Sequence, residues 1–335
     1  MMKANAIKRS WFMKLFIFFL HCSNGIVESA GVPALFVFGD SLVDVGNNNY
    51  LSSIAKANYF PYGVDNFGPT GRFSNGKTFV DILGENLGVP YPPAFADPNT
   101  AGSRILGGVN YASAAAGILD ESGQHYGQRY SLSQQVLNFE TTLNQIRTLM
   151  SGGNLTEYLG KSVAVLVFGS NDYINNYLMP SIYSSSYYYN PPDFANLLLN
   201  HYTRQLLALY SLGLRKFLLA GIGPLDRCVD YVNQILGTYN EGLKSLVDQL
   251  NTHPGAMFLY GNTYGAVGDI LNNPSTYGQI TCLPWVVPCS NRNTSVFWDA
   301  FHPTEGVNAI LAQRAFNGPP RDCYPINVQQ MTLIY

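Results

Sequence analysis

Three residues of the kinds that together carry out acyl transfer lie near the two ends of this chain. Ser41 follows the apolar run Leu35–Gly39 and one aspartate, and Asp299 and His302 lie three positions apart in the last part of the sequence. A serine hydroxyl becomes a strong nucleophile when an imidazole accepts its proton, and a carboxylate on the other ring nitrogen fixes the imidazole tautomer. The pattern predicts Ser41 as nucleophile, His302 as general base and Asp299 as the acid that orients it. Each residue also has a plainer interpretation, a helix-capping serine or a surface Asp–His pair.

A fourth polar residue follows another apolar run. Asn171 lies in the sequence Gly169-Ser-Asn-Asp directly after Val163–Phe168. An amide N–H placed there can stabilise a developing oxyanion together with the backbone N–H of Ser41, and one such donor contributes ~3 kcal/mol to the transition state. The alternative for a lone asparagine after a strand is an Asx turn.

The first 29 residues differ from the rest and predict a secretory signal peptide. Four basic residues, Lys3, Lys8, Arg9 and Lys14, precede the apolar run Leu15–Leu20, and small and polar residues follow it. A membrane anchor is the alternative, but this run is far shorter than the roughly 20 residues that a bilayer span needs. We therefore expect a signal peptide at 1–29, a single domain at 30–335 and a protein exported from the cell.

The remainder of the chain after residue 29 has 15 basic and 20 acidic residues, a net charge of −5. No basic surface indicates nucleic acid as a partner, and no later segment predicts a membrane span. Sparse cysteines in an oxidising compartment favour disulfides over a metal site, with the pairing left open. Those cysteines are Cys228, Cys282, Cys289 and Cys323, and two possible glycan acceptors are Asn154 and Asn293.

The apolar pattern predicts an α/β fold, a three-layer α/β/α sandwich around a mostly parallel five-stranded sheet. Runs that are apolar at consecutive positions and end near glycine are typical of strands buried on both faces. Apolar residues at 3–4 spacing between Val232 and Leu250 predict a helix, and a second helix is expected after Pro191-Pro192, with Asp193 as its N-cap. The expected strands are Ala34–Phe38, Val109–Ala112, Val163–Phe168, Phe217–Ala220 and Met257–Tyr260. In such folds ligands bind beyond the carboxyl ends of the strands.

Four ordered segments together resemble the motif blocks of the GDSL (SGNH) esterase/lipase family, in its secreted plant branch. The resemblance covers about residues 33–325, and no Gly-x-Ser-x-Gly elbow of an α/β-hydrolase occurs. The segments that carry it are Phe38-Gly-Asp-Ser-Leu42, Gly108-Val-Asn-Tyr-Ala-Ser113 with Gly117, Gly169-Ser-Asn-Asp172 and Asp299-Ala-Phe-His-Pro303. The chain lacks the longer, cysteine-bearing stretch that relatives carry after Leu225 and their Cys-Cys-Gly segment before Gln279.

The resemblance implies a flavodoxin-like sheet with strand order 2-1-3-4-5, no cofactor and an extracellular carboxylic ester hydrolase. It implies an oxyanion hole made of the Ser41 N–H, the Asn171 amide and a backbone N–H of the second block. That third donor is expected at Gly117, with Ala115 as the alternative because many relatives carry glycine at this position. The expected substrate is an ester of a lipid, a cutin-like polymer or an acylated sugar.

Two other functions remain open at this point. An acyltransferase would use the same triad and pass the acyl group to a hydroxyl instead of water. A non-catalytic cell-wall-binding protein could retain the fold and use some of its 23 tyrosines for binding.

Overall fold

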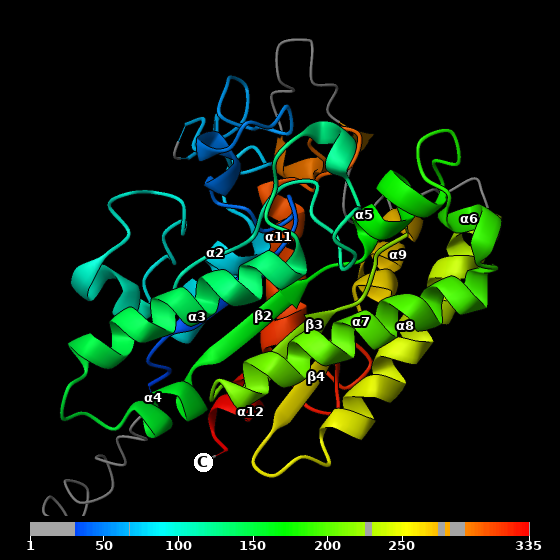
Figure 1. The fold of residues 1–335 in the computed structure, drawn as a ribbon. Helices are drawn as coiled ribbons and strands as arrows, with labels where there is room; N and C mark the ends of the chain where they lie inside the picture. Colours follow the sequence, from blue (N-terminus) through cyan, green and yellow to red (C-terminus); the bar gives the residue numbers. More distant parts are fainter. Residues whose placement is uncertain (1–30, 67, 225–229, 274–278, 282–291, 335) are drawn as a thin grey trace, which may run out of the picture. The chain divides into compact units, whose positions relative to one another are not determined.

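The computed structural model describes residues 31–66, 68–224, 230–273, 279–281 and 292–334 (Figure 1). Strands and helices alternate along most of this length, as the apolar pattern predicts. The strands are β1 (Leu35–Gly39), β2 (Val163–Val167), β3 (Lys216–Ala220), β4 (Met257–Gly261), β5 (Gln279–Thr281), β6 (Ser295–Phe297) and β7 (Cys323–Tyr324). The α-helices are α2 (Phe79–Leu87), α3 (Leu132–Leu149), α4 (Leu155–Lys161), α5 (Ser170–Asp172), α6 (Ser185–Tyr188), α7 (Pro191–Ser211), α8 (Asp230–Leu250), α9 (Thr263–Asn272), α11 (Glu305–Asn317) and α12 (Val328–Thr332).

The main sheet has five strands in the order β1-β2-β3-β4-β7. The first four run parallel and in register, and β7 adds antiparallel to β4 at the edge. A separate two-stranded sheet pairs β5 with β6. All four parallel strands therefore end at the same edge, where Gly39 and Gly261 close β1 and β4.

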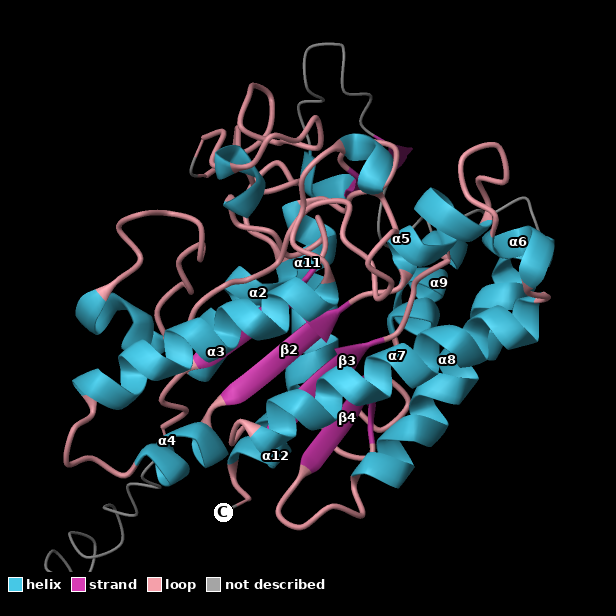
Figure 2. Cartoon of the chain, viewed as in Figure 1, coloured by secondary structure: helices cyan, strands magenta, loops and turns pink. Residues whose placement is uncertain are grey.

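Helices cover both faces of this sheet, because the strands are apolar on both sides (Figure 2). Phe36 and Phe38 of β1 pack in one core with α3, α7 and α8. Leu35 and Val37, which alternate with them, pack in the other core with α2, α11 and α12. In Figure 1 the helices α3 and α7 lie in front of the strands and α2 and α11 behind them. The predicted three-layer arrangement is confirmed.

The expectation of a regular strand at Val109–Ala112 is wrong. The segment nevertheless lies beside β1, where the order 2-1-3-4-5 places the second strand. Its backbone follows the free edge of β1, with the Val37 N–H donating to the Val109 carbonyl at 3.0 Å and the Tyr111 N–H to the Val37 carbonyl at 2.7 Å. The ladder is then interrupted, because the N–H of Gly39 donates to the side chain of Gln135 in α3, although the Ser113 N–H still donates to the Gly39 carbonyl at 3.0 Å. The fifth strand is the antiparallel β7.

The two helices expected from the apolar spacing form as α7 and α8. The expectation that Asp193 is the N-cap of α7, made from its position after two prolines, is wrong. The cap is Asn190, whose side chain accepts the backbone N–H of Asp193. Prolines at the first positions of the helix have no N–H to satisfy, so the cap lies before them.

Several expectations fall outside the described residues. These are the signal peptide at 1–29, the cysteines Cys228, Cys282 and Cys289, and the side chain of Asn293. Asn154 is exposed and caps α4, and Cys323 is buried in β7. Across the residues that the structure describes, no helix has both the length and the apolar character required to cross a bilayer.

Candidate active site

Ser41 lies just beyond the carboxyl end of β1, in the turn that reverses the chain. The Asp40 carbonyl accepts the N–H groups of Val43 and Asp44, and the Asp40 side chain accepts that of Leu42 at 2.9 Å. These bonds form a tight turn whose second residue is the half-buried Ser41. The hydroxyl therefore projects from a rigid backbone rather than from a loose loop.

Gly39 fixes the start of this turn by close packing. A Cβ at this position would lie 2.5 Å from a methyl group of Val43 and 2.9 Å from the Val167 carbonyl of the neighbouring strand. The side chain of Gln135 both accepts the Gly39 N–H at 2.9 Å and donates to its carbonyl at 2.8 Å. The residue before the turn is thus held from both sides.

His302 and Asp299 lie in the bend between β6 and α11. The Asp299 Oδ1 accepts the backbone N–H groups of Phe301 and His302 at 2.8 and 2.9 Å, so the carboxylate itself closes the bend. The carbonyl of His302 accepts the N–H of Trp298 at 2.7 Å. Pro303 follows and keeps His302 out of the helix, as its position in the sequence predicts.

The structure brings the three predicted residues together. The Nε2 of His302 lies 2.7 Å from the Oγ of Ser41, and its Nδ1 lies 2.7 Å from Asp299 Oδ2 and 2.8 Å from Oδ1. Asp299 and His302 are both buried. An unbroken hydrogen-bonded chain thus runs from a carboxylate through an imidazole to a hydroxyl.

The pKa values of two carboxyl groups near the imidazole are shifted in opposite directions. Burial alone would raise the pKa of Asp299, but the neighbouring imidazole and its hydrogen bonds lower it to about 2, so this group is ionised. Burial raises the pKa of Asp40 to about 7, against the opposing effect of the Leu42 N–H. Asp299 therefore carries the negative charge next to the imidazole at neutral pH. Within the described parts of the chain, no three His, Cys, Asp or Glu side chains converge as metal ligands would.

Asp44 anchors the turn that follows Ser41 to the segment 110–116. Its buried carboxylate accepts the backbone N–H groups of Gly46 and Asn47 at 2.7 Å, that of Asn48 at 3.4 Å and that of Ala114 at 3.1 Å. One side chain thus satisfies four buried donors and joins two segments of the site.

Replacing Asp44 by alanine is expected to destabilise the fold by at least about 3 kcal/mol, because buried N–H groups would lose their acceptor. Urea unfolding measures this loss. Asp97→Ala is the matched control, since the Asp97 carboxylate accepts only exposed donors, the backbone N–H and the side-chain amide of Asn99, and its loss is expected to cost under about 1 kcal/mol. Equal costs for the two variants would contradict the anchoring role of Asp44.

Asn171 lies in the short helix α5, directly after β2, and reaches the same site as Ser41. Its Nδ2 donates to the Ala116 carbonyl at 2.9 Å and makes only a long contact of 3.4 Å with Asp40. Its Oδ1 accepts from the side chain of Asn175 at 2.5 Å. The amide is thus oriented by its neighbours, and one of its N–H groups is only weakly engaged.

Ala115, rather than Gly117, lines the cavity that holds Ser41. Ala115 has a positive φ of 67°, a conformation that favours glycine. Gly117 is packed away from the cavity, where a Cβ would lie 2.6 Å from a carboxylate oxygen of Asp172. The structure thus places Ala115, and not Gly117, on the cavity wall, since this glycine serves close packing and the left-handed residue of the segment is the alanine.

Two residues that line this cavity have backbone N–H groups with no acceptor in the described part of the chain. They are Ser41 and Ala115, whereas the N–H groups on either side of Ala115 donate to Asp44 and to the Ser113 carbonyl. Backbone donors left open beside a nucleophile are what an oxyanion requires.

Two cavities meet at Ser41 and share Asn171 and His302. The larger, about 380 Å³, is mostly aromatic, and the other, about 330 Å³, is mostly aliphatic. Aromatic side chains of the first are Tyr59, Phe60, Tyr62, Phe73, Tyr126, Trp298 and Phe301, and apolar side chains of the second include Leu42, Val267, Leu271, Val296, Val307 and Leu311. Together they provide space on two sides of the hydroxyl.

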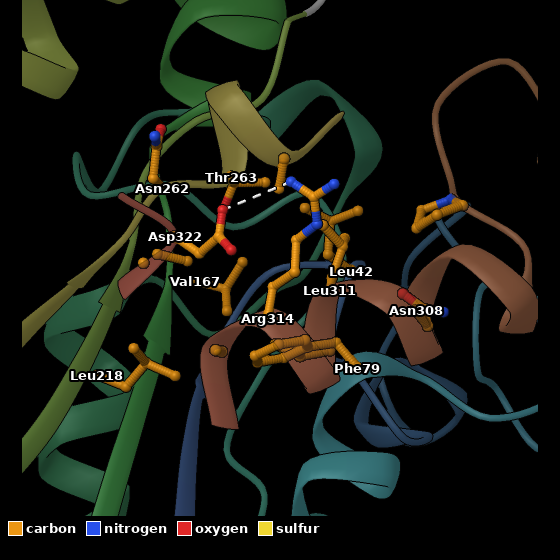
Figure 3. A pocket seen from close by; sticks show the side chains of 16 residues that line it. Leu42, Phe79, Val167, Leu218, Asn262, Thr263, Asn308, Leu311, Arg314 and Asp322 are labelled. Atoms are coloured by element: carbon orange, nitrogen blue, oxygen red, sulfur yellow. Dashed lines mark hydrogen bonds and ion pairs between the residues drawn. The ribbon is translucent and has the colours of Figure 1, made fainter. Parts of the chain in front are cut away.

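A third, smaller cavity of about 70 Å³ lies behind Leu42 and is lined almost entirely by carbon (Figure 3). Arg314 extends across it and pairs with Asp322 and Asp269. None of Ser41, Asn171 or His302 contributes to its wall. It is a packing cavity beneath the turn and not a place where the hydroxyl can reach a ligand.

Sequence reasoning did not single out Tyr62, Gln135 or Asp44. Tyr62 contacts Asp299 across 237 positions and Gln135 contacts Gly39 across 96, and no local pattern marks such partners. Asp44 had a usable signal, since a carboxylate followed by Gly46 and three asparagines is typical of a capped turn.

Comparison with known proteins is consistent with this geometry. The family model described as GDSL-like lipase/acylhydrolase matches residues 35–315, a span that holds Ser41, Asn171, Asp299 and His302. One Arabidopsis thaliana GDSL esterase/lipase is 62% identical over 342 aligned residues, covering 92% of this chain and 91% of the relative. A second is 50% identical over 358 residues, covering 96% and 93%. The chain therefore belongs to the GDSL-like lipase/acylhydrolase family and has its SGNH hydrolase fold.

Proposed function

We propose that this protein is a secreted serine esterase/lipase that hydrolyses carboxylic esters through an acyl-enzyme. Ser41 is the nucleophile, His302 the general base and Asp299 the acid that orients it. The observation that carries the proposal is the hydrogen-bonded chain from Asp299 through His302 to Ser41, with 2.7 Å on each side of the ring. The names of the relatives, GDSL esterase/lipase, support an ester as substrate.

The mechanism follows from the direction of the hydrogen bonds. The hydroxyl proton of Ser41 passes to Nε2 of His302 while Oγ bonds to the ester carbonyl carbon. The imidazolium formed is stabilised by Asp299, which is ionised. It then gives its proton to the leaving alcohol, and the acyl group remains on Ser41. Water, deprotonated by the same nitrogen, releases the acid and restores the hydroxyl.

Three donors stabilise the oxyanion in this proposal. They are the N–H groups of Ser41 and Ala115, two residues that line the cavity, and the Nδ2 of Asn171. The amide N–H that makes only a 3.4 Å contact with Asp40 is the one that would turn to the oxyanion. Ala115 takes the place expected for Gly117 in this proposal because Ala115 lines the cavity and its N–H has no acceptor among the described residues.

The two cavities on either side of Ser41 accommodate the two arms of an ester. Their volumes of about 380 and 330 Å³ exceed what an acetyl group needs, so we expect longer or bulkier esters to be turned over faster. A series of p-nitrophenyl esters from acetate to long acyl chains measures this preference.

A fluorophosphonate probe tests the proposal directly. Its phosphorus bonds to an activated serine oxygen with loss of fluoride, and peptide mass spectrometry is expected to place the label on Ser41. Turnover of p-nitrophenyl butyrate with and without an alcohol acceptor separates hydrolysis from acyl transfer to a hydroxyl. Folded protein that neither takes up the label nor turns over esters would instead indicate a binding protein.

Replacing Asn171 by alanine is expected to lower kcat roughly 10²–10³-fold with little change in KM, because a donor to the oxyanion is lost. Steady-state kinetics on p-nitrophenyl butyrate measures this. Asn251→Ala is the matched control, since its amide bridges backbone groups of Phe258 at the opposite end of β4. An unchanged kcat in the Asn171 variant would exclude the amide as a donor.

Export from the cell is the remaining part of the proposal. The composition of residues 1–29 supports a cleaved leader, and Asn154 is exposed, as a glycan acceptor must be. N-terminal sequencing of protein recovered from the medium, with and without glycosidase treatment, tests cleavage and modification together.

A further inference from the structure

A phenol contacts the carboxylate of the triad, and the mechanism above gives it no role. The Oη of Tyr62 donates to Asp299 Oδ2 at 2.8 Å. Tyr62 lies in the loop that precedes α2, 237 positions away in the sequence. It is half-buried, and it lines the larger cavity beside Ser41.

The two oxygens of Asp299 have different partners. Oδ1 accepts two backbone N–H groups, from Phe301 and His302, which close the bend. Oδ2 accepts Nδ1–H of His302 and the phenol of Tyr62. Tyr62 is the one donor to Oδ2 outside the bend itself, among the residues that the structure describes. Without it, this oxygen would face the cavity.

The loop that carries Tyr62 is fastened to the segment that follows His302. The N–H of Gly63 donates to the Ser74 carbonyl at 2.9 Å, and the Ser74 hydroxyl donates to the Pro303 carbonyl at 3.3 Å. Asn75 accepts the N–H of Glu305 at 2.8 Å. The phenol and the carboxylate therefore belong to two segments that are also joined by other hydrogen bonds.

Aromatic packing also fixes the ring. Tyr62 meets Phe73 edge-on with centroids 5.8 Å apart, and Phe73 lies against the His302 ring at 4.8 Å. Burial and the neighbouring Asp299 charge raise the pKa of Tyr62 well above its usual range. The phenol therefore keeps its proton and acts only as a donor to the carboxylate.

We propose that Tyr62 is a positioning residue that holds Asp299 in the plane of the His302 ring and limits how tightly the carboxylate binds the imidazolium. The inference rests on the proposed function, because it assigns Tyr62 a part in the same triad. A phenol shares the negative charge of Oδ2 with Nδ1–H. When the phenol is removed, the charge of Oδ2 acts on the Nδ1–H group alone, and the carboxylate holds the imidazolium more tightly.

Among the described residues, charged or titratable groups lie in the triad, in the β1 turn and on the wall of the larger cavity. Asp299 pairs with Nδ1, and Asp40 acts on the ring from the β1 turn. Tyr62 faces the carboxylate, and Tyr59 and Lys56 lie on the wall of the same cavity. Tyr62→Phe changes only one of these groups and keeps the ring that packs on Phe73.

In Tyr62→Phe we expect kcat to fall about tenfold with KM within about twofold, because the substrate carbonyl does not contact the phenol. The acid limb of the kcat/KM profile is expected to move to higher pH, because the carboxylate then holds the imidazolium more tightly. Tyr158→Phe is the matched control. It loses a similar phenol hydrogen bond, to the Leu106 carbonyl at 2.9 Å, away from the triad.

Thermal unfolding of both variants separates a fold defect from a site defect. A Tyr62→Phe enzyme that is folded and has the wild-type kcat and acid limb would overturn the inference. So would a raised KM with an unchanged pH profile, which would make Tyr62 a substrate contact. If wild-type protein shows no turnover that depends on Ser41, the proposed function fails instead. The low-field proton resonance of His302 Nδ1–H in the two proteins then still tests the contact.

Discussion

Replacing Ser41 by alanine is expected to lower kcat for ester hydrolysis by roughly four to six orders of magnitude. The hydroxyl lies 2.7 Å from Nε2 of His302, and we found no second hydroxyl within hydrogen-bond distance of that nitrogen among the described residues. The residual rate would come from water attacking an ester already held against the oxyanion donors. Binding of a non-hydrolysable ester analogue is expected to stay within a few-fold of wild type, since both cavities keep their walls.

The fold should tolerate this change. Ser41 is half-buried, and its backbone N–H and carbonyl do not hold the turn, which depends on Asp40. Ser113→Ala is a useful contrast, because Ser113 is a buried serine whose hydroxyl donates to Asn48 at 2.5 Å. It is expected to lose stability and keep measurable turnover. A Ser41→Ala protein with wild-type activity would refute the proposed nucleophile.

The sheet and its two helical layers follow from sequence because their signals are local. Runs such as Val163–Phe168 are apolar at every position and are followed by a glycine, so each strand is recognisable without its neighbours. The segment at Val109 is not a regular strand for a non-local reason, since a glutamine in α3 takes the N–H of Gly39 and interrupts the ladder with β1. Antiparallel β7 is only two residues long, too short for any periodic pattern.

The site is predictable to the extent that its residues are close in sequence or resemble known motif blocks. Asp299 and His302 lie in one bend and their contact follows from spacing. The sequence favours Gly117 over Ala115 as the third oxyanion donor, but a glycine can be required either for space or for a positive φ. Here Gly117 makes room for Asp172, whereas the positive φ falls on Ala115. The presence of a glycine in the sequence does not show whether the position lacks space for a Cβ or requires a positive φ.

Replacing Asp299 by asparagine is expected to lower kcat by roughly 10⁴-fold. The amide oxygen can still accept the N–H groups of Phe301 and His302, so the bend should persist. The amide nitrogen would then face Nδ1 of His302 and the phenol of Tyr62, two positions that now donate to a carboxylate oxygen. Nδ1 would have to become an acceptor, which puts the ring proton on Nε2. A protonated Nε2 cannot take the proton of Ser41.

Asp269→Asn is the control for loss of one negative charge, because its carboxylate pairs with Arg314 at the surface and lines none of the three cavities. The double variant Ser41→Ala with Asp299→Asn gives the sharper result. If the carboxylate acts only through the imidazole on Ser41, the double variant should be no slower than Ser41→Ala alone. A further loss in the double variant would mean that Asp299 also contributes to the attack of water or to substrate binding. The linear chain from carboxylate to hydroxyl predicts that no such loss occurs.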